Sequence, residues 1–508
     1  MGKDYLVTKN IVFNFGGQII LLLLGIFTAP FIIHTLGNNL YGVFALVNVV
    51  VGYFSILDLG LGLSIIKYIS EYHAKSDKEG LEKVLGTALS AYIVIGFIGA
   101  GLILLFTNLF LGRVLHIPPE VLPVALTVFY ISAFGFFVNM ILTVVNSIPP
   151  ALQRMDIQNS RNVIFGVIST FGTVLLLALG QGLTSVVIWN IVISVVATAV
   201  FFSIIVKLVP FVHIRPSFDK EIFKKLMRFG LFKFLSNVSG QIVFQLDRLL
   251  IAAFHPVAFV TFYTAPAVIA QKGLMIVLNV NNAVFPAMSQ AHTLGDMDRA
   301  KDLYLRMAKF ITFLMLPLAA LLFVLSDLFL LVWLGPEFSL RSAQVLKILA
   351  IAYFMAAMSA PGVVAADAFG KPQIASIFAG VSAAINFIAA IILIPRFGIE
   401  GAAWALLINF VAQVPIFLMV VNKKLIKVSN FKFLQYAILK PIISGVIASL
   451  ILFQVTSFLQ GILGLFAGAI IFGIFYLAIN LILGTIETRD RKAAAYFLGK
   501  IGSSFRRG

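Results

Sequence analysis

The sequence predicts an all-α integral membrane protein with about fourteen transmembrane helices. Hydrophobic residues make up 61% of the chain and charged residues only 11%, whereas soluble domains have roughly 45–50% and about 25% of these classes. The apolar residues form continuous runs of about 20 residues or more, which is the length that crosses the hydrocarbon core as a helix. Short polar loops separate the runs, and a membrane β-barrel would instead show shorter segments of alternating hydrophobicity.

Each apolar run predicts one helix. In chain order, the predicted helices cover residues 9–33, 41–66, 83–107, 121–145, 161–180, 183–206, 229–254, 258–286, 307–327, 343–365, 372–394, 401–421, 434–456 and 461–484. The first run is longer than the core of a cleaved signal peptide, and no small-residue cleavage site follows it, so we expect this helix to be retained. The chain contains no cysteine, which excludes a disulfide and a thiolate metal site.

The positive charges fall almost entirely in alternate loops. The formal net charge is +17, and the lysines and arginines cluster in every second loop and in the tail. The intervening loops hold Arg113, Arg341, Lys347 and Arg396. Because cytoplasmic loops are enriched in Lys and Arg, this pattern places both termini in the cytoplasm, as an even number of helices also requires. Topology and contacts with lipid headgroups explain the net charge better than nucleic-acid binding does.

Two pairs of short segments indicate an internal repeat. Residues 180–190 (GQGLTSVVIWN) and 398–409 (GIEGAAWALLIN) both place an asparagine eight positions after a glycine, and residues 16–20 (GGQII) resemble residues 239–243 (SGQIV). Both pairs have a similar offset along the chain, which spans six predicted helices. An even number of helices preserves orientation, so the halves are expected to be parallel repeats, and rocking of one lobe against the other would give alternating access.

The repeat and the charge pattern together predict five regions. We expect an N-terminal six-helix lobe (1–206), a basic cytoplasmic linker (207–228), a C-terminal six-helix lobe (229–424), two additional C-terminal helices (425–484) and a basic cytoplasmic tail (485–508). The two lobes would enclose a central cavity. A static bundle that only anchors partners is the structural alternative, and polar residues within the helices disfavour it because they cost free energy without a use.

Several longer segments resemble one family of transporters. They are LGNNLYGVFALVNVVVGYFSILDLGLGLSIIKYISEYHA (36–74), ALQRMDIQN (151–159), LDRLLIAAF (246–254), TFYTAPAVI (261–269) and FPAMSQ (285–290). These segments are similar to the polysaccharide-exporter or O-antigen flippase branch of the multidrug/oligosaccharidyl-lipid/polysaccharide (MOP) superfamily. The resemblance extends over essentially the whole chain, and fourteen helices in 6+6+2 order suit that superfamily.

The resemblance implies a non-enzymatic flippase in the inner (plasma) membrane. It would move an oligosaccharide on a polyprenyl phosphate or pyrophosphate from the cytoplasmic to the outer leaflet, for surface polysaccharide or glycan biosynthesis. Glycan polymerases or glycosyltransferases are the implied partners, no cofactor is expected, and H⁺ or Na⁺ coupling could supply energy. A MATE-like drug/cation antiporter is the runner-up, and a membrane scaffold or a glycan polymerase comes third, because one fold serves many functions.

Ionisable residues inside a membrane helix mark candidate transport sites, because a charge near the bilayer centre costs about 3 kcal/mol. Asp247 and Arg248 lie well inside the seventh predicted helix. As neighbours in sequence they point about 100° apart, so they need not pair with each other. We expect Arg248 to bind substrate and Asp247 to bind a coupling ion, and the alternative is a structural pair that fastens this helix to a neighbour.

Amide side chains precede this pair at helical spacing. Asn237, Gln241 and Gln245 follow one another every four residues and form a polar stripe, with Arg248 three residues further on. Gln18 in the first helix corresponds to Gln241 in the repeat. Gln18, Gln241 and Gln245 are therefore candidate substrate-binding residues, with hydrogen bonding between helices as the structural alternative.

Basic residues within or beside the helices are further candidates for binding an anionic headgroup. Lys272 lies deep in the eighth helix. Lys233 lies near the start of the seventh helix, where it could instead extend to the lipid headgroups. Lys67 borders the second helix, and Arg154 follows the fourth helix together with Arg161. The positive-inside distribution is an equal explanation for the two arginines.

Acidic and amide residues could bind a coupling cation. Asp58 in the segment LDLGLG borders the second helix. Asn386 in the eleventh helix joins Asp247 in a candidate Na⁺ site by analogy with the lipid II flippase branch, and oxygen ligands suit such a cation. The sequence has no Walker A or HExxH motif, and its histidines are scattered, so we expect neither an ATPase nor a metal centre. Asp296 and Asp298 spell DxD, which helix capping explains better than nucleotide-sugar binding.

Overall fold

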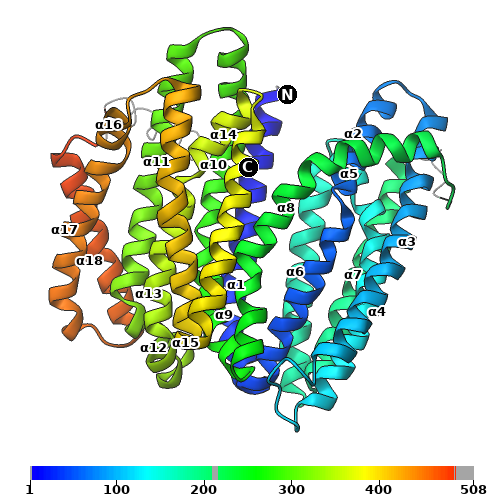
Figure 1. Ribbon diagram of the computed structural model, residues 1–508, viewed down its shortest axis with the longest axis horizontal. Coiled ribbons are helices and arrows are strands. Elements are labelled where there is room, and N and C mark those ends of the chain that lie inside the picture. Colours follow the sequence, from blue (N-terminus) through cyan, green and yellow to red (C-terminus); the bar gives the residue numbers. More distant parts are fainter. Residues whose placement is uncertain (1–2, 209–214, 486, 488–508) are drawn as a thin grey trace. The chain divides into compact units, whose positions relative to one another are not determined.

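The computed structural model describes residues 3–208, 215–485 and 487, and for residues 3–16, 19, 205–208 and 229–237 it describes the backbone alone. The described residues are almost entirely helical, as Figure 1 shows, which confirms the all-α prediction. Two compact units can be distinguished. The first consists of Met1–Thr264 and Ala383–Ala402, and the second of Ala265–Ser382 and Ala403–Gly508.

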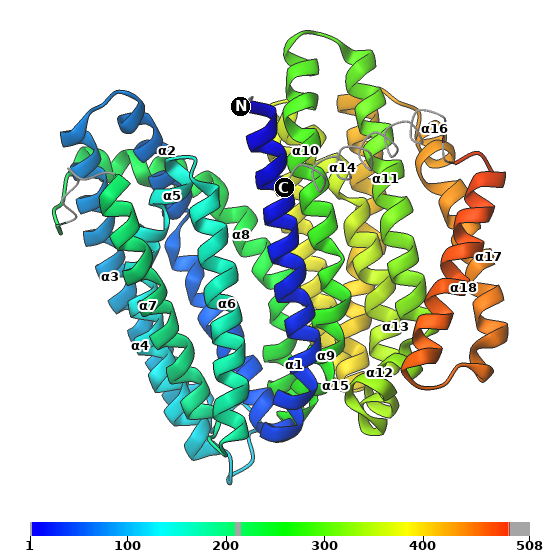
Figure 2. The ribbon, with the colours of Figure 1, turned by 180° about the vertical axis from the view of Figure 1, so that it is seen from behind.

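The first unit is a bundle of long helices. It contains α1 (Lys3–Phe54), the 3-10 turn η1 (Ser55–Asp58), α2 (Leu61–Ala74), α3 (Lys78–Phe110), α4 (Leu122–Asn146), α5 (Ile148–Ala151), α6 (Met155–Ala178), α7 (Leu183–Leu208) and α8 (Lys220–Phe254). It also contains the start of α9 (Ala258–Lys272) and the middle of α15 (Pro372–Val421). Figure 2 shows α3, α4, α6 and α7 side by side, with α3 packed on α4 and α7 packed on both α4 and α6.

The second unit holds the remaining helices. They are α10 (Leu274–Thr293), α11 (Met297–Val324), α12 (Ser326–Leu334), α13 (Pro336–Met358), α14 (Ala360–Ala368), η2 (Asn422–Ile426), α16 (Asn430–Phe433), η3 (Leu434–Leu439), α17 (Lys440–Val455), η4 (Thr456–Phe458) and α18 (Gly461–Ile482), with the outer parts of α15. Both α17 and α18 pack on α11. An apolar cluster joins them, formed by Leu325, Ala448, Leu452, Phe472 and Tyr476.

The helices account for the predicted number of membrane crossings. Within the described residues, eleven helical segments are long and apolar enough to cross a membrane. Two of these segments are divided by a glycine with positive φ, Gly37 (φ 75°) in α1 and Gly398 (φ 58°) in α15. Glycine adopts this backbone region without a steric penalty, and each divided segment consists of two helices. Together with α8, the eleven segments therefore contain fourteen helices, the number that the hydropathy pattern predicts.

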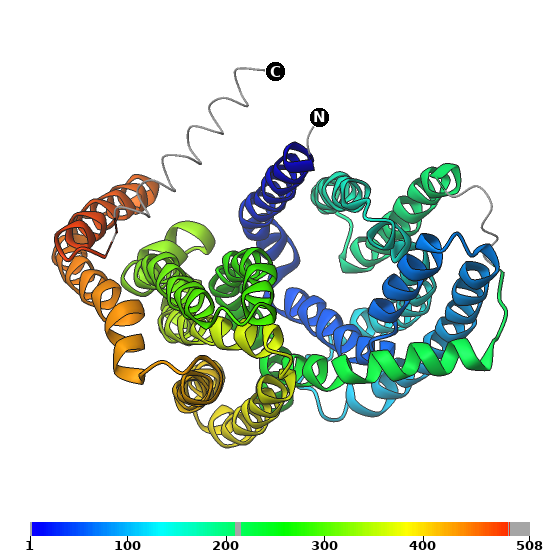
Figure 3. The same cartoon turned by 90° about the horizontal axis from the view of Figure 1, so that it is seen from above.

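The predicted region boundaries at residues 206, 228, 424 and 484 stay predictions. Residues 209–214 of the expected linker and residues 486 and 488–508 of the expected tail lie outside the described residues. In the first unit, Figure 3 shows the green α8 lengthwise, so this helix crosses the unit obliquely. Of the polar residues singled out in the seventh predicted helix, Gln241, Gln245, Asp247 and Arg248 lie in the second half of α8.

Candidate functional site

Asp247 and Arg248 form a buried ion pair in α8. Their side chains are 8% and 6% exposed, and Nη1 of Arg248 lies 3.7 Å from Oδ1 of Asp247. The same carboxylate oxygen accepts a hydrogen bond from the backbone N–H of Arg248 at 2.8 Å, and the hydroxyl of Tyr263 donates to Oδ2. The sequence left open whether the two residues pair with each other, and in the structure they do.

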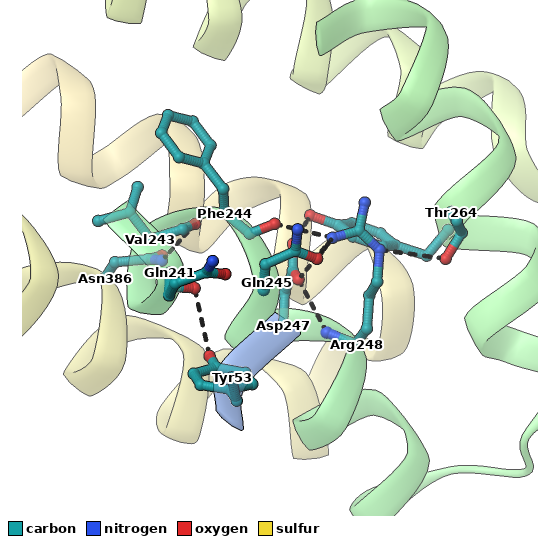
Figure 4. A network of polar contacts seen from close by, with 10 residues as sticks. Tyr53, Gln241, Val243, Phe244, Gln245, Asp247, Arg248, Thr264 and Asn386 are labelled. Atoms are coloured by element: carbon teal, nitrogen blue, oxygen red, sulfur yellow. Dashed lines mark hydrogen bonds and ion pairs between the residues drawn. The ribbon is translucent and has the colours of Figure 1, made fainter. Parts of the chain in front are cut away.

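Four further groups surround the guanidinium of Arg248 (Figure 4). Nη1 donates to the carbonyl oxygen of Phe244 at 2.7 Å and to Oε1 of Gln245 at 2.9 Å. Nε donates to the hydroxyl of Thr264 at 3.3 Å, and the ring of Tyr263 lies 5.9 Å from the guanidinium carbon. A buried charge is tolerated when it is paired and hydrogen-bonded, so this network explains how α8 accommodates an arginine.

The polar stripe of α8 contributes to the same region. Gln245 binds Arg248, as their spacing of three residues predicts. One turn earlier, the hydroxyl of Tyr53 donates to the backbone carbonyl of Gln241 at 3.3 Å, and the Gln241 side chain is half-buried. The predicted third member of the stripe, Asn237, has a side chain outside the described part of the chain.

Asn386 of α15 lies beside this network. It is 3% exposed, and its Nδ2 donates to the carbonyl oxygen of Val243 at 3.1 Å. Both carboxylate oxygens of Asp247 already accept hydrogen bonds. Among the described residues, no group of three or more His, Cys, Asp or Glu side chains could hold a metal ion. The Na⁺ site at Asp247 and Asn386 therefore stays a prediction.

The other acidic candidate, Asp58, lies where η1 ends and α2 begins. Its carboxylate accepts a hydrogen bond from the hydroxyl of Tyr92 and one from the backbone N–H of Gly62 at 3.3 Å. The chain turns here through two residues with positive φ, Leu59 and Gly60. A carboxylate that binds the first turn of a helix stabilises it through the helix dipole, so Asp58 stabilises the start of α2.

Four other basic and amide candidates of the first unit are Arg154, Lys67, Gln18 and Lys233. Arg154 binds Asp156 through Nε at 2.9 Å and Nη2 at 2.8 Å, and this hydrogen bonding raises the pKa of Arg154. The exposed Lys67 lies 4.9 Å from the ring centroid of Tyr68. Gln18 is exposed, and the side chain of Lys233 lies outside the described residues.

Arg161 of α6 has a more distinctive environment than Arg154. It is half-buried, and its Nη2 donates to the hydroxyl of Thr198 in α7 at 3.2 Å. Its Nε has no hydrogen-bond partner among the described residues, and neither has Oε1 of Gln158 one turn earlier. No described carboxylate pairs with Arg161. This arginine is therefore available to an anion in a way that the bidentate Arg154 is not.

In the second unit, Lys272 is the last residue of α9, and its side chain is exposed. Gly273 follows it, and a Cβ at that glycine would lie only 2.7 Å from a methyl carbon of Leu318, so α11 closely approaches the backbone there. An exposed lysine inside a candidate membrane span faces lipid or a polar passage. The predicted role of Lys272 in substrate binding stays a prediction.

Sequence reasoning did not identify three members of the α8 network: Tyr53, Tyr263 and Thr264. Tyrosine and threonine are common in membrane helices, so their presence in a helix does not by itself predict a functional site. The usable signal was the need of the buried Asp247 and Arg248 for partners. That need predicts polar residues nearby but not the helix that provides them.

Comparisons with known proteins give a consistent picture. The family described as polysaccharide biosynthesis protein matches residues 7–292. A protein of Shigella flexneri named as a candidate O-antigen transporter is 26% identical over 403 residues, which cover 78% of this chain and 93% of that protein. The Bacillus subtilis membrane protein EpsK is 24% identical over 343 residues, covering 65% of this chain and 66% of EpsK.

Solved structures share the fold. The lipid II flippase MurJ in an inward closed conformation aligns with a TM-score of 0.72 at 16% identity, covering 93% of this chain and 98% of MurJ. An inward-facing multidrug transporter of the MATE family in the MOP superfamily aligns with a TM-score of 0.65 at 18% identity, covering 80% of this chain and 95% of that transporter. At these identities the likeness establishes a common fold.

Proposed function

Because this chain belongs to the polysaccharide biosynthesis protein family, we propose that it moves a polyprenyl-linked oligosaccharide from the cytoplasmic to the outer leaflet. The proposed mechanism is alternating access between two lobes, and the proposed use is surface polysaccharide or glycan biosynthesis. The protein is a multi-pass membrane protein. Its placement in the inner membrane, with both termini in the cytoplasm, belongs to the proposal and is supported by the distribution of Lys and Arg.

The observation that carries the proposal is the buried network of Asp247 and Arg248 in α8. Charged residues inside membrane helices are rare, and they mark substrate and ion pathways. A scaffold would not need them, because an apolar contact between helices would be at least as stable. In the proposal, Arg248 and the half-buried Arg161 interact with the phosphate groups of the lipid carrier, and no catalytic residue is required.

The name of the Shigella relative supports the glycan as substrate class, since it concerns O-antigen transport. A drug or cation antiporter is the second candidate, because MATE transporters share the fold. Half-buried and exposed cations within candidate spans, Arg161 and Lys272, suit an anionic substrate better than a cationic one. H⁺ or Na⁺ coupling and glycan-polymerase or glycosyltransferase partners remain part of the proposal.

The proposal can be tested in a deletion strain complemented with variants of the chain. We expect loss of surface glycan, with lipid-linked intermediates confined to the cytoplasmic face of the membrane, and rescue by the wild type. Arg161→Gln should rescue poorly at normal membrane level. Arg113→Gln, which removes an exposed arginine outside the helices, is the matched control. Unchanged surface glycan together with increased sensitivity to cationic dyes would assign the protein to drug efflux.

A further inference from the structure

The first turns of α8 carry a stripe of cations on one helix face. Lys220, Lys224 and Arg228 follow one another every four residues, so they lie above one another on the same side. All three are exposed. Among the described residues, none of them takes part in a salt bridge, which distinguishes them from Lys75 and Lys83, each bound to a glutamate one turn away. The stripe therefore presents uncompensated positive charge.

The opposite face of these turns is fastened to α2. Ile222 and Leu226 are 6% and 0% exposed. The hydroxyl of the buried Ser64 in α2 donates to the carbonyl oxygen of Leu226 at 2.8 Å. Because residues 222 and 226 lie about half a helical turn away from residues 220 and 224, burial of the first pair turns the cations away from the bundle.

Hydrogen bonds from the segment before α8 determine the position along α3 at which the cation-bearing start of α8 lies. The backbone N–H of Ser217 donates to the carbonyl of Gly86 at 3.3 Å, and the hydroxyl of Ser90 donates to the carbonyl of Ser217 at 2.9 Å. The N–H of Asp219 donates to the hydroxyl of Thr87 at 3.1 Å. Residues 78–83 of α3 are rich in charge and residues 84–106 are apolar. The start of α8 therefore lies where α3 passes from headgroup to hydrocarbon.

An exposed aromatic residue lies at the same place. Phe218 precedes the cap of α8, where Asp219 accepts a hydrogen bond from the N–H of Ile222 at 3.0 Å. Its ring lies 5.3 Å from the ring of Phe223, as in a hydrophobic staple. Phe218 nevertheless remains 63% exposed. An exposed aromatic ring beside exposed lysines is typical of segments that lie in a membrane interface.

The neighbouring cations Lys67, Lys75 and Lys225 contribute less to such a surface. The pKa of Glu71 is lowered, first by the hydrogen bond from Lys75 and also by the charges of Lys67 and Lys225. These three lysines therefore share one carboxylate. The uncompensated charge lies in the stripe of Lys220, Lys224 and Arg228, which we call the α8 cation stripe.

We propose that the α8 cation stripe binds the phosphate headgroups of anionic phospholipids, with the ring of Phe218 at the boundary between headgroups and acyl chains. Three features support anionic phospholipids as the ligand. The charges are complementary, the start of α8 lies where α3 passes from headgroup to hydrocarbon, and α8 continues into the membrane. The partner is the bilayer itself and is distinct from the transported lipid. The inference does not depend on the proposed transport function.

The test measures which lipid is enriched beside Phe218. The full chain with Phe218→Trp is placed in phosphatidylcholine nanodiscs with a minor fraction of phosphatidylglycerol, with bromine on the acyl chains of one lipid or of the other. Emission of the three native tryptophans is subtracted with the parent chain. We expect the phosphatidylglycerol bromines to quench Trp emission about twofold more efficiently per lipid than the phosphatidylcholine bromines, and high salt to reduce the difference.

Two charge variants make the test specific. Replacing Lys220, Lys224 and Arg228 with Gln should abolish the preference for the anionic lipid. Replacing Lys423, Lys424 and Lys427 with Gln removes three exposed lysines of the second unit and should leave the preference intact. Equal quenching by both brominated lipids in the Phe218→Trp protein that keeps its native charges would overturn the proposal. So would no quenching by either, or equal loss in both charge variants. The discs contain no lipid-linked glycan, so a failed transport function would not affect this result.

Discussion

The hydroxyl of Ser169 in α6 donates to Oδ1 of Asn190 in α7 at 2.5 Å. The same bond recurs in the second unit, where the hydroxyl of Ser382 donates to Oδ1 of Asn409 at 2.9 Å across the two halves of α15. Each asparagine follows a glycine by eight residues. Each helical hairpin thus contains a serine–asparagine hydrogen bond of the same kind. The asparagine that the short sequence repeat has in common makes this bond in both hairpins.

Removing this contact should weaken the first hairpin slightly. Ser169→Ala removes a hydrogen bond within the membrane, which is worth about 0.6 kcal/mol on average, so we expect a small decrease in thermal unfolding temperature in detergent. Ser203→Ala is the control, because among the described residues the exposed Ser203 hydroxyl binds only the carbonyl oxygen of Ala199 in its own helix. An equal decrease in both variants would contradict a role for the hairpin contact.

The ion pair of α8 should behave as one unit. Arg248→Gln leaves the buried Asp247 without its positive partner, and breaking a buried pair costs about 3–5 kcal/mol. We expect low membrane levels for Arg248→Gln and for Asp247→Asn, and higher levels for the double variant, because the neutral amides can bind each other. Levels are measured by quantitative immunoblotting of membranes. A double variant that is less abundant than either single variant would refute the coupling.

Tyr263 should matter more than Tyr53, although both donate a hydroxyl near the network. Tyr263 donates to a carboxylate, and a hydrogen bond to a charged group is worth about 1.5–3 kcal/mol. Tyr53 donates to a backbone carbonyl at 3.3 Å. Tyr263→Phe should therefore lower the unfolding temperature more than Tyr53→Phe, with both rings retained. The reverse order would show that Asp247 does not depend on the Tyr263 hydroxyl.

Lys272 provides a test of function without a stability effect. Its side chain is exposed, and surface substitutions away from special features change stability by about 0.5 kcal/mol or less. If Lys272 holds the anionic carrier, Lys272→Ala should abolish glycan export at normal membrane level. Lys371→Ala, which removes an exposed lysine outside the candidate spans, should export normally. Normal export by Lys272→Ala would remove this residue from the proposed site.

The end of α18 should be sensitive to one carboxylate. Glu487 accepts hydrogen bonds from Lys309 at 3.1 Å and from the hydroxyl of Tyr436 at 2.8 Å, and the Lys309 side chain is 9% exposed. Glu487→Ala leaves a buried lysine without its carboxylate and should lower the unfolding temperature. Lys309→Met, which keeps the volume without the charge, should be better tolerated. If Lys309→Met destabilises more than Glu487→Ala, the lysine stabilises this region by other contacts.

The helices could be predicted from the sequence because a lipid solvent leaves a strong periodic signal. Contacts within one helix were also accessible: Arg248 binds Gln245 three residues earlier, and Asp296 caps α11 by accepting from the N–H of Arg299 at 3.0 Å. Contacts between helices were not. Tyr263 reaches Asp247 from the following helix, and Lys309 finds Glu487 far along the chain. Spacing rules describe one helix and carry no information about which neighbour it meets.

The candidate site was predicted in part for the same reason. Charge within an apolar run identified Asp247 and Arg248, but their mutual pairing depends on side-chain rotamers that the sequence does not specify. Asp58 shows the converse: its role as a cation ligand stays a prediction, and its contacts with Gly62 and Tyr92 were not predicted. These contacts depend on two residues with positive φ before α2, which only the folded backbone reveals.

The attachment of residues 217–226 to α2 and α3 has a mechanical consequence. Hydrogen bonds at Ser217, Asp219 and Leu226 connect this segment to two other helices of the first unit. A displacement of the start of α8 is therefore transmitted to α2 and α3, unless these bonds break. The start of α8 therefore moves together with α2 and α3 as one rigid group, which reduces the number of independent motions in any conformational cycle. A ligand that restrains this group of helices would change the rate of the conformational cycle without contacting the transported molecule.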